Sequence, residues 1–172
     1  MKKDEIIIYT DGCSLGNPGP GGWAAVLISH SLRKEIMGGF KHTTNNRMEI
    51  LAIIKALELI KSELKYEITI YTDSKLITDS INKNWIWSWR KKGWKKADKT
   101  QVLNVDLWER LYPLLKKFNV KFEWIKGHSG IPENERCDYL SKLAASSDNL
   151  ENDVFYIEKP SIEFHDMGPL FN

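Results

Sequence analysis

The stretch Ile6-Ile7-Ile8-Tyr9-Thr10-Asp11 decides the fold. It is short and apolar or β-branched, it carries no charge before its last residue, and Gly12 follows it. A run of this kind is typical of a strand that is buried on both faces of a sheet. A carboxylate at the end of such a strand is costly unless a cation meets it. We therefore interpret Asp11 as the ligand of a cation.

The chain on the C-terminal side of this strand predicts an α/β fold with a mixed sheet. The glycine-rich stretch 11–22 predicts a loop, and short connections make the next two strands an antiparallel meander with the first. The order strand, helix, strand that follows implies a right-handed crossover, so later strands run parallel to the first. The predicted strands are 6–11, 23–29, 35–42, 67–72 and 120–125, and the predicted helices are 47–64, 74–82, 104–118 and 133–145.

Length and composition bound the class of protein. With 172 residues, the chain is expected to form one domain of ordinary size. No apolar run approaches the roughly 20 residues that cross a bilayer, and we expect no membrane association. The N-terminus has no apolar segment of a signal peptide. Cys13 and Cys137 are far apart and do not form a disulfide framework, which favours the cytoplasm.

Charge divides the chain into a basic body and an acidic tail. The whole chain carries +2, and residues 148–172 hold six acids and one lysine, which leaves +7 on residues 1–147. A basic body favours a polyanionic partner such as nucleic acid. The tail also holds apolar clusters, so we consider two roles for it. It either packs on the body, or it docks a partner protein or competes with the substrate.

Four acids occupy positions that solubility does not explain. Asp11 and Asp73 end apolar strands, Glu49 shares a predicted buried helix stripe with two alanines, and Asp138 follows Cys137 in the last helix. Parallel neighbouring strands bring their C-terminal ends together. Like charges there would raise one another's pKa, which divalent cations prevent. The alternative is that each acid is separate, as a turn former, a cap or a surface residue.

Oxygen ligands select hard ions such as Mg²⁺, with Mn²⁺ as a substitute. Two such ions about 3.5–4 Å apart stabilise the attacking and leaving oxygens of a phosphoryl displacement. His128, between glycines in a loop near the Asp138 helix, is suited to proton transfer at neutral pH, although a lone loop histidine is usually a surface residue.

The segment Lys83–Lys99 combines seven basic residues with four of the seven tryptophans and a single acid. Cations follow a phosphate backbone, and aromatic rings stack on sugars or bases, so this segment predicts nucleic-acid binding. The alternative is a solvated helix with a satellite cluster of aromatic residues.

Together these residues resemble the type I ribonuclease H family in its bacterial form. Separate motifs match in the family's order, between about residue 4 and about residue 146. They are Tyr9-Thr-Asp-Gly12, Gly16-Asn-Pro-Gly-Pro-Gly-Gly22, Thr43-Thr-Asn-Asn-Arg-Met-Glu49, Thr72-Asp-Ser74, Trp85 to Trp94 with Asn104-Val-Asp-Leu-Trp108, Lys126-Gly-His128 and Pro132-Glu-Asn-Glu-Arg-Cys-Asp138.

The resemblance implies a ribonuclease H-like fold, with a five-stranded mixed sheet flanked by helices. It implies endonucleolytic hydrolysis of the RNA strand of RNA–DNA hybrids by two-metal-ion catalysis, giving 5′-phosphate and 3′-hydroxyl ends with low sequence specificity. In that mechanism one ion activates the attacking water and the other stabilises the leaving 3′-oxygen. It also divides the chain into a catalytic domain over 1–147, with a basic handle at about 83–99, and the tail over 148–172. We expect a monomer.

The resemblance also assigns roles to individual residues. The metal-binding carboxylates fall on Asp11, Glu49, Asp73 and Asp138, and the histidine that assists proton transfer or product release falls on His128. Contacts to the RNA strand fall on Gly12, Cys13, Asn17, Asn45 and Asn46, and a pocket for a DNA phosphate falls on Thr44 and Asn104. The handle residues are Trp85, Trp89, Lys91 and Lys92, and we add Lys75, Asn134 and Arg136 as substrate contacts.

The order Cys13-Ser14 and the charged Lys75 depart from the pattern of the family's close members. Two other classes stay open at this point. One is a non-catalytic module that binds hybrids, and the other is a nuclease or integrase of the same fold that acts on DNA. The complete set of acids opposes the first, while Asn45, Asn46 and the handle oppose the second.

Overall fold

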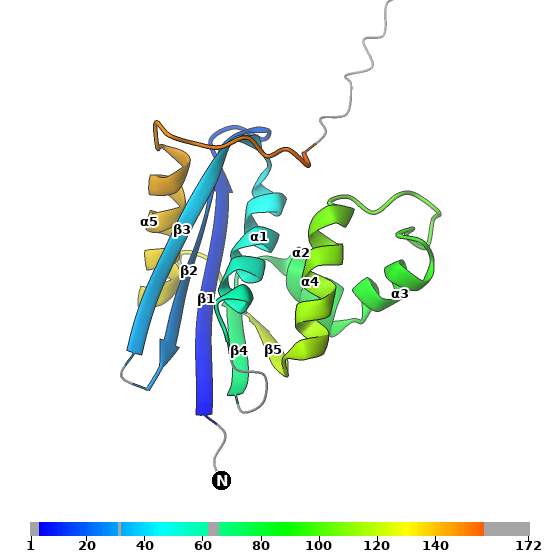
Figure 1. The fold of residues 1–172 in the computed structure, drawn as a ribbon, viewed down its shortest axis with the longest axis horizontal. Helices are drawn as coiled ribbons and strands as arrows, with labels where there is room; N and C mark the ends of the chain where they lie inside the picture. The colour runs from blue at the N-terminus through cyan, green and yellow to red at the C-terminus, as the bar shows by residue number, and fades with distance from the viewer. Residues whose placement is uncertain (1–3, 31, 62–65, 157–172) are drawn as a thin grey trace, which may run out of the picture.

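A five-stranded mixed sheet with helices on both faces forms the molecule, in a computed structural model that describes residues 4–30, 32–61 and 66–156 (Figure 1). The sheet order is β3-β2-β1-β4-β5, with β1 antiparallel to β2, β2 antiparallel to β3, and β4 parallel to both β1 and β5. The predicted fold class is therefore confirmed. The strands are β1 Asp4–Ser14, β2 Gly19–Ser29, β3 Leu32–Thr43, β4 Tyr66–Thr72 and β5 Val120–Trp124, and the helices are α1 Asn45–Glu58, α2 Lys75–Asn82, α3 Trp85–Lys91, α4 Val105–Lys117 and α5 Pro132–Ala145.

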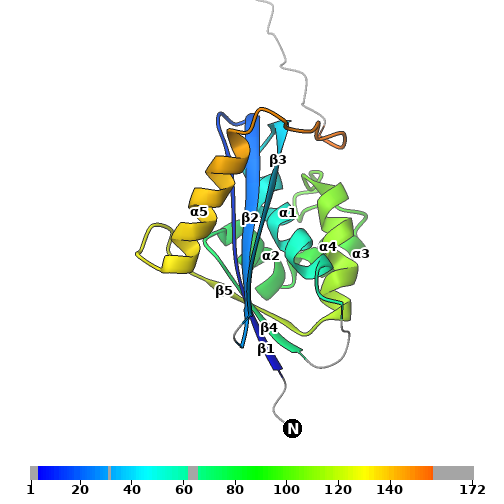
Figure 2. The same cartoon turned by 60° about the vertical axis from the view of Figure 1, so that its left-hand side comes forward.

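The central strand β1 is covered by helices on its two faces to different degrees. Ile6, Ile8 and Thr10 are buried on the face that packs against α1, whereas Ile7 and Tyr9 are only half-buried on the opposite face. Figure 2 shows α5 alone on that second face and the other helices opposite it. The prediction of a strand buried on both faces is thus correct for the α1 side and only partly correct for the α5 side. Each isoleucine buried on the α1 side contributes about 1.5–3 kcal/mol to stability.

The predicted loop over 11–22 is wrong for most of its length. β1 continues to Ser14 and β2 begins at Gly19, so Cys13 pairs with Gly22 and only residues 15–18 connect the strands. The glycines allow helices to pack closely on the strands and do not form a long turn. A Cβ on Gly22 would collide with the main chain of α5 at Ser141, and a Cβ on Gly12 would collide with the main chain of Glu49 in α1. Strands with bare backbone let both helices approach the sheet.

Helix α1 is shorter and more deeply buried than the prediction of 47–64. It ends at Glu58, because the N–H groups of Leu59 and Ile60 bond to Ala56 and Leu57, three residues back, and tighten the last turn. Residues 62–64 of the predicted helix lie outside the described part. The predicted apolar stripe is buried, and so are Ile50, Leu51 and Ile54 outside it, because α1 lies between the sheet and α4.

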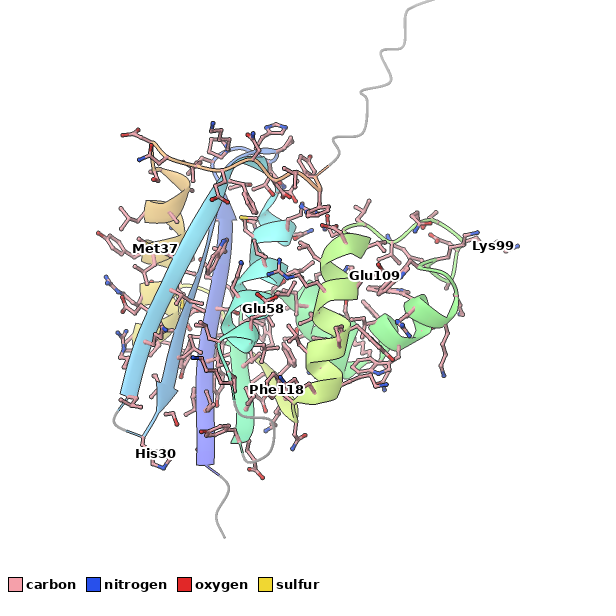
Figure 3. All side chains as sticks on the ribbon, in the orientation of Figure 1. His30, Met37, Glu58, Lys99, Glu109 and Phe118 are labelled. Carbon is pink, nitrogen blue, oxygen red and sulfur yellow. The ribbon has the colours of Figure 1, made fainter. Side chains whose placement is uncertain are left out.

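The handle, residues 83–99, lies beside the sheet on the far side of α4 (Figure 1). Its short helix α3 is attached by aromatic contacts, since the Trp89 ring centroid lies 5.8 Å from that of Trp108 in α4. Trp94 is buried and its indole N–H donates to Glu109 of α4 over 2.9 Å. Lys99 lies at the outer end of the handle, away from the sheet (Figure 3).

The first nine residues of the acidic tail, which we call the strap (residues 148–156), lie against the body. The strap crosses the end of the sheet from α5 toward α1 (orange in Figure 1). The N–H of Lys41 in β3 donates to the carbonyl of Glu151 over 2.8 Å, and Phe40 forms a parallel bridge with the same residue. Residues 157–172, and with them the apolar clusters around 162–164 and 170–171, lie outside the described residues. Among the described residues, no helix has the length and apolar character to cross a membrane.

Candidate active site

The parallel register of β1 and β4 brings two strand ends together. The Cα partners run from Asp4–Tyr66 to Tyr9–Tyr71, and the same register continued by two residues sets Asp11 beside Asp73. The rings of Tyr9 and Tyr71 stack with centroids 5.0 Å apart just before these acids. The sequence-based expectation of neighbouring, parallel strand ends is therefore confirmed.

Glu49 reaches the same edge from the first turn of α1. The absence of a side chain at Gly12 lets the main chain of Glu49 lie directly against β1. Asn45, one turn earlier, donates its side-chain N–H to Glu49 Oε1 over 3.0 Å, and Ser74 at the start of α2 also hydrogen-bonds this carboxylate. Glu49 is thus held in place from two helices and one strand.

Helix α5 covers the other side of Asp11. The hydroxyl of Ser141 donates to Asp11 Oδ2 over 2.8 Å, and the thiol of Cys137 donates to the carbonyl of Tyr9 over 3.3 Å. Asp138 lies on the same helix between these two residues, and its Oδ2 accepts from Lys142 Nζ at 2.7 Å. The four acids, which we call the carboxylate cluster, therefore come from β1, α1, the end of β4 and α5.

Burial and the neighbouring carboxylates raise the pKa values of three acids in this cluster. The pKa of Asp11 is raised to about 6, by burial first and by the charges of Asp73 and Asp138, against the hydrogen bond from Ser141. The pKa of Glu49 is raised to about 7, again by burial first and then by the charges of Asp11 and Asp73. The pKa of Asp73 is also raised, by burial first and by Asp138 after it, while His128 opposes the rise. Each shift means that the charged form is disfavoured at this place.

The donor set of the cluster fits a hard divalent cation. Its atoms are carboxylate oxygens, which such ions prefer. Among the ion pairs of residues 4–30, 32–61 and 66–156, none involves Asp11, Glu49 or Asp73. A cation from solution would offset both the burial and the repulsion that raise these three pKa values.

A second grouping overlaps the cluster at Asp138. Atoms of His128, Glu135 and Asp138 lie within 4.8 Å of one another, at a spacing that could hold a metal ion. His128 is 71% exposed and its Nδ1 lies 3.8 Å from Glu135 Oε2. Glu135 is not among the residues that the sequence singled out, and the signal that would have found it is its position one turn before Asp138 on the same helix.

The predicted contacts to an RNA strand lie next to Glu49. The N–H of Asn45 donates to Asn17 Oδ1 over 3.2 Å, which joins the β1–β2 connection to the start of α1. Asn46 is exposed, Cys13 is half-buried and Gly12 is buried, so Gly12 offers only main-chain atoms. Thr44 and Asn104 are the N-cap residues of α1 and α4, and neither side chain bonds to its own helix.

The remaining predicted contacts are spread over three regions. Trp85 is exposed and its ring centroid lies 6.0 Å from that of Trp89, and Lys91 and Lys92 are exposed at the end of α3. Lys75 Nζ lies 4.7 Å from the Trp124 ring centroid. On α5, Arg136 forms a two-pronged hydrogen bond with Glu35 over 3.0 and 2.9 Å. Asn134 is only 4% exposed and its Oδ1 has no hydrogen-bond partner among the described residues.

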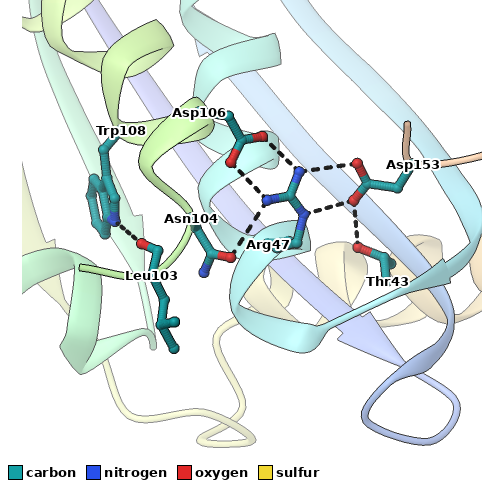
Figure 4. A network of polar contacts seen from close by, with 7 residues as sticks. All are labelled: Thr43, Arg47, Leu103, Asn104, Asp106, Trp108 and Asp153. Atoms are coloured by element: carbon teal, nitrogen blue, oxygen red, sulfur yellow. Dashed lines mark hydrogen bonds and ion pairs between the residues drawn. The ribbon is translucent and has the colours of Figure 1, made fainter. Parts of the chain in front are cut away.

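An ion-pair centre that the sequence did not reveal lies behind Asn104 (Figure 4). Arg47 is 3% exposed, donates from Nε to Asp153 over 2.7 Å and binds both oxygens of Asp106 over 2.9 and 2.7 Å. Thr43 donates to the same Asp153 over 2.8 Å. Hydrogen bonds to the two acids raise the pKa of Arg47 against the effect of burial. We call Arg47, Asp106 and Asp153 the Arg47 centre. No signal in the sequence pointed to it, because Asp153 lies 106 positions from Arg47 along the chain.

Comparison with known proteins assigns the family. Residues 3–146 match the RNase H family profile. The chain belongs to the RNase H family. It is 52% identical over 158 residues to a ribonuclease H of Nitratidesulfovibrio vulgaris (strain DSM 19637 / Miyazaki F), covering 92% of this chain and 100% of that protein. It is 48% identical over 154 residues to a ribonuclease H of Escherichia coli O9:H4 (strain HS), covering 90% of this chain and 97% of the relative.

Solved structures agree with this assignment. The crystal structure of LC9-RNase H1 superposes with a TM-score of 0.73 at 25% identity, over 84% of this chain and 74% of that one. LC11-RNase H1 in complex with an RNA/DNA hybrid gives 0.63 at 26% identity, over 81% and 96%. Members of the RNase H family are divalent-metal endonucleases that hydrolyse the RNA strand of RNA–DNA hybrids. This chain is therefore an endoribonuclease of the RNase H type.

Proposed function

We propose that this chain hydrolyses the RNA strand of RNA–DNA hybrids at the carboxylate cluster, with Mg²⁺ as the ion and Mn²⁺ as a substitute. One observation carries this proposal, namely that acids from four elements meet at the C-terminal ends of β1 and β4, where burial and neighbouring charge raise the pKa values of Asp11, Glu49 and Asp73. Asp11, Glu49, Asp73 and Asp138 would hold two ions. When bound, the ions supply positive charge at the scissile phosphate and make a water more acidic.

Side chains beside the cluster would select and orient the RNA strand. The amides of Asn45, Asn46 and Asn17 can donate to and accept from a 2′-hydroxyl, which is the group that distinguishes RNA from DNA. Asn45 also donates to Glu49, so the group that would sense the sugar is tied to a proposed metal ligand. His128, exposed at the rim, would take up or deliver a proton, or help the product leave.

Thr44 and Asn104 would hold a phosphate of the DNA strand. Both cap helices that start side by side, and neither side chain satisfies its own helix. In α1 the N–H of Asn45 already donates to Asn17 Oδ1, so an anion would meet the N–H groups that follow it and those at the start of α4. The cations and rings of the handle, with Trp85, Trp89, Lys91 and Lys92 foremost, would follow the backbone beyond this phosphate. Lys75, Asn134 and Arg136 would be further substrate contacts, although Arg136 is engaged by Glu35 and Asn134 is buried.

We place this activity in the cytoplasm, with the protein acting as a monomer. The thiols of Cys13 and Cys137 are free, as expected in a reducing compartment. A partner protein that binds the tail, residues 148–172, stays a prediction of the sequence.

The decisive experiment incubates matched RNA–DNA, RNA–RNA and DNA–DNA duplexes with the protein, in Mg²⁺ and in EDTA. We expect cleavage of the RNA strand of the hybrid alone, only with Mg²⁺, and products with 5′-phosphate ends. Binding without cleavage would mean a non-catalytic module, and cleavage of the DNA duplex would mean a DNA nuclease of the same fold. Either result overturns the proposal.

A further inference from the structure

The end of the strap reaches the place that we propose for a DNA phosphate. A pocket of about 750 Å³ has Asn17, Thr44, Asn46 and Asn104 in its lining, together with two residues of the strap, Phe155 and Tyr156. Four segments that are far apart in the sequence therefore share one pocket. They are the β1–β2 connection, the start of α1, the start of α4 and the strap.

The strap is held at this pocket by specific contacts. Asp153 receives hydrogen bonds from Arg47 and Thr43, and its own side chain is 4% exposed (Figure 4). Three residues further on, the Tyr156 ring centroid lies 5.8 Å from the Arg47 guanidinium and 5.6 Å from the centroid of the His42 ring. Phe155 is thus fixed between two anchored positions.

The Arg47 centre also orients a pocket donor. Arg47 Nη1 donates to Asn104 Oδ1 in a long hydrogen bond of 3.5 Å. The amide nitrogen of Asn104 consequently points away from Arg47 (Figure 4). Asn104 therefore presents a donor rather than an acceptor away from the centre, which suits an anionic group.

Phe155 lies in a lining of mixed polarity. Its side chain is an apolar ring that is 71% exposed, and the lining contains Val102, Leu103 and Val105 as well as the amide and hydroxyl groups named above. An exposed aromatic ring beside polar groups is a typical anchor for a ligand with both polar and apolar parts. In a DNA strand, the apolar part next to a phosphate is the deoxyribose, which lacks the 2′-hydroxyl of RNA.

We propose that Phe155 packs against a deoxyribose of the DNA strand, next to the phosphate held by Thr44 and Asn104, so that the strap is part of the hybrid-binding surface. The inference rests on the proposed function. A ribose at this position would bring a 2′-hydroxyl against a phenyl ring, which offers it no strong hydrogen bond in place of the displaced water. The strap thereby favours DNA over RNA in the strand that is not cut.

The test compares Phe155→Ala with Val154→Ala in the full chain. Val154 is the matched control, since it is 77% exposed on the same strap and does not line the pocket. We measure KM and kcat for hybrid hydrolysis in Mg²⁺, and affinity for a labelled hybrid in EDTA. We expect Phe155→Ala to raise KM and weaken affinity by about fivefold to tenfold, in the lower range of aromatic stacking on nucleic acid, with kcat unchanged.

A second set of substrates tests the sugar directly. Each hybrid carries a single ribonucleotide at one position of its DNA strand, and the position is moved along the strand. We expect the wild type to bind one substitution about fivefold more weakly than the all-DNA strand, and Phe155→Ala to lose that discrimination. Both variants should keep the melting temperature of the wild type, because the two side chains are exposed.

Equal KM values for the two variants, or unchanged discrimination in Phe155→Ala, would overturn the inference. These outcomes leave the proposed function intact as long as the wild type hydrolyses the all-DNA hybrid. A wild type that does not cleave the hybrid would instead overturn the proposed function, and the inference with it.

Discussion

Two groups of buried and half-buried carboxylates stand out among the described residues, and they differ in the proposed origin of their cation. In the Arg47 centre, Asp106 and Asp153 surround a guanidinium that belongs to the chain. In the carboxylate cluster, Asp11, Glu49 and Asp73 have raised pKa values and no ion-pair partner among the described residues. The first group is a structural ion pair. The second has no such cation of its own among the described residues, and we propose that a cation from solution supplies the missing charge.

Removing an acid from the two groups should therefore have opposite consequences. In the Arg47 centre it leaves the buried guanidinium with only one of its two acids, which lowers stability. In the cluster it removes repulsion, which raises the stability of the metal-free protein while it destroys the ion site. Substitutions in the two groups and in the handle test this contrast, from the largest expected effect to the smallest.

Substitution in the cluster should abolish catalysis and spare folding. We expect Asp11→Asn or Asp73→Asn to lower the cleavage rate about a thousandfold or more, because the charge that stabilises the reacting phosphate is removed. Hybrid affinity in EDTA should change little. The measurement is single-turnover cleavage of a labelled hybrid, with Asp79→Asn, a surface acid paired with Lys83, as the control. Turnover that survives in both cluster variants would contradict the assigned metal role.

Substitution in the Arg47 centre should do the reverse. We expect Asp153→Ala to lower the free energy of unfolding by about 3–5 kcal/mol, since Arg47 would stay buried with only one acid. The matched control is Glu151→Ala on the same strap, whose main-chain carbonyl and not its side chain bonds to Lys41. Urea unfolding of the two variants decides the point. Equal stability of the two variants would mean that solvent compensates the charge of Arg47 when Asp153 is removed.

The pH dependence of stability should reveal the repulsion in the cluster. The folded-state pKa values of Glu49, about 7, and Asp11, about 6, exceed the ordinary values of 4.5 and 3.8. The folded protein therefore binds more protons than the unfolded one in this range, and stability is lost as pH rises from about 4 to about 7. We expect Glu49 alone to contribute roughly 2–3 kcal/mol of this loss in EDTA.

Melting curves of the wild type and of Glu49→Gln between pH 4 and pH 8 measure that contribution. Glu58→Gln, a surface acid paired with Arg110, is the control. The difference between wild type and Glu49→Gln should shrink when Mg²⁺ is added at pH 7.5, because the ion binds the charged carboxylates of the wild type. A difference that does not depend on pH would show that folding does not raise the pKa of Glu49.

Substitutions in the handle should give the smallest effect, because its charged side chains are exposed and remain solvated. We expect the pair of substitutions Lys91→Ala and Lys92→Ala to reduce the slope of log affinity against log salt by about 0.9 for each phosphate that is no longer neutralised. The rate at saturating hybrid should not change. Lys34→Ala, on the edge strand at the opposite side of the sheet, is the control. An unchanged slope would place these lysines outside the hybrid path.

Sequence reasoning predicted what local pattern controls. The apolar run 6–11, the alternation of strands and helices and the acids at strand ends were sufficient for the sheet topology and for bringing Asp11 beside Asp73. It failed where tertiary packing decides the conformation. The glycines between residues 12 and 22 looked like a loop, yet two helices press against them and keep them in strands.

The Arg47 centre shows the limit more sharply. No periodicity or spacing links Arg47 to Asp153, so the second acid of a buried pair was interpreted as part of an acidic tail. Ser141 was missed for the same reason, since its bond to Asp11 spans 130 positions. A residue whose role depends on one distant partner cannot be recognised from the sequence around it.

The distance between Arg47 and Asp153 along the chain bears on how the protein is made. A ribosome releases the segment with Arg47 long before the one with Asp153, so the nascent chain first has only Asp106 available to neutralise this guanidinium. The corner where β3, α1 and α4 meet is then completed only after Asp153 has left the ribosome. Fragments that stop before residue 153 would keep most of the sheet and yet lack the counter-charge that secures this corner.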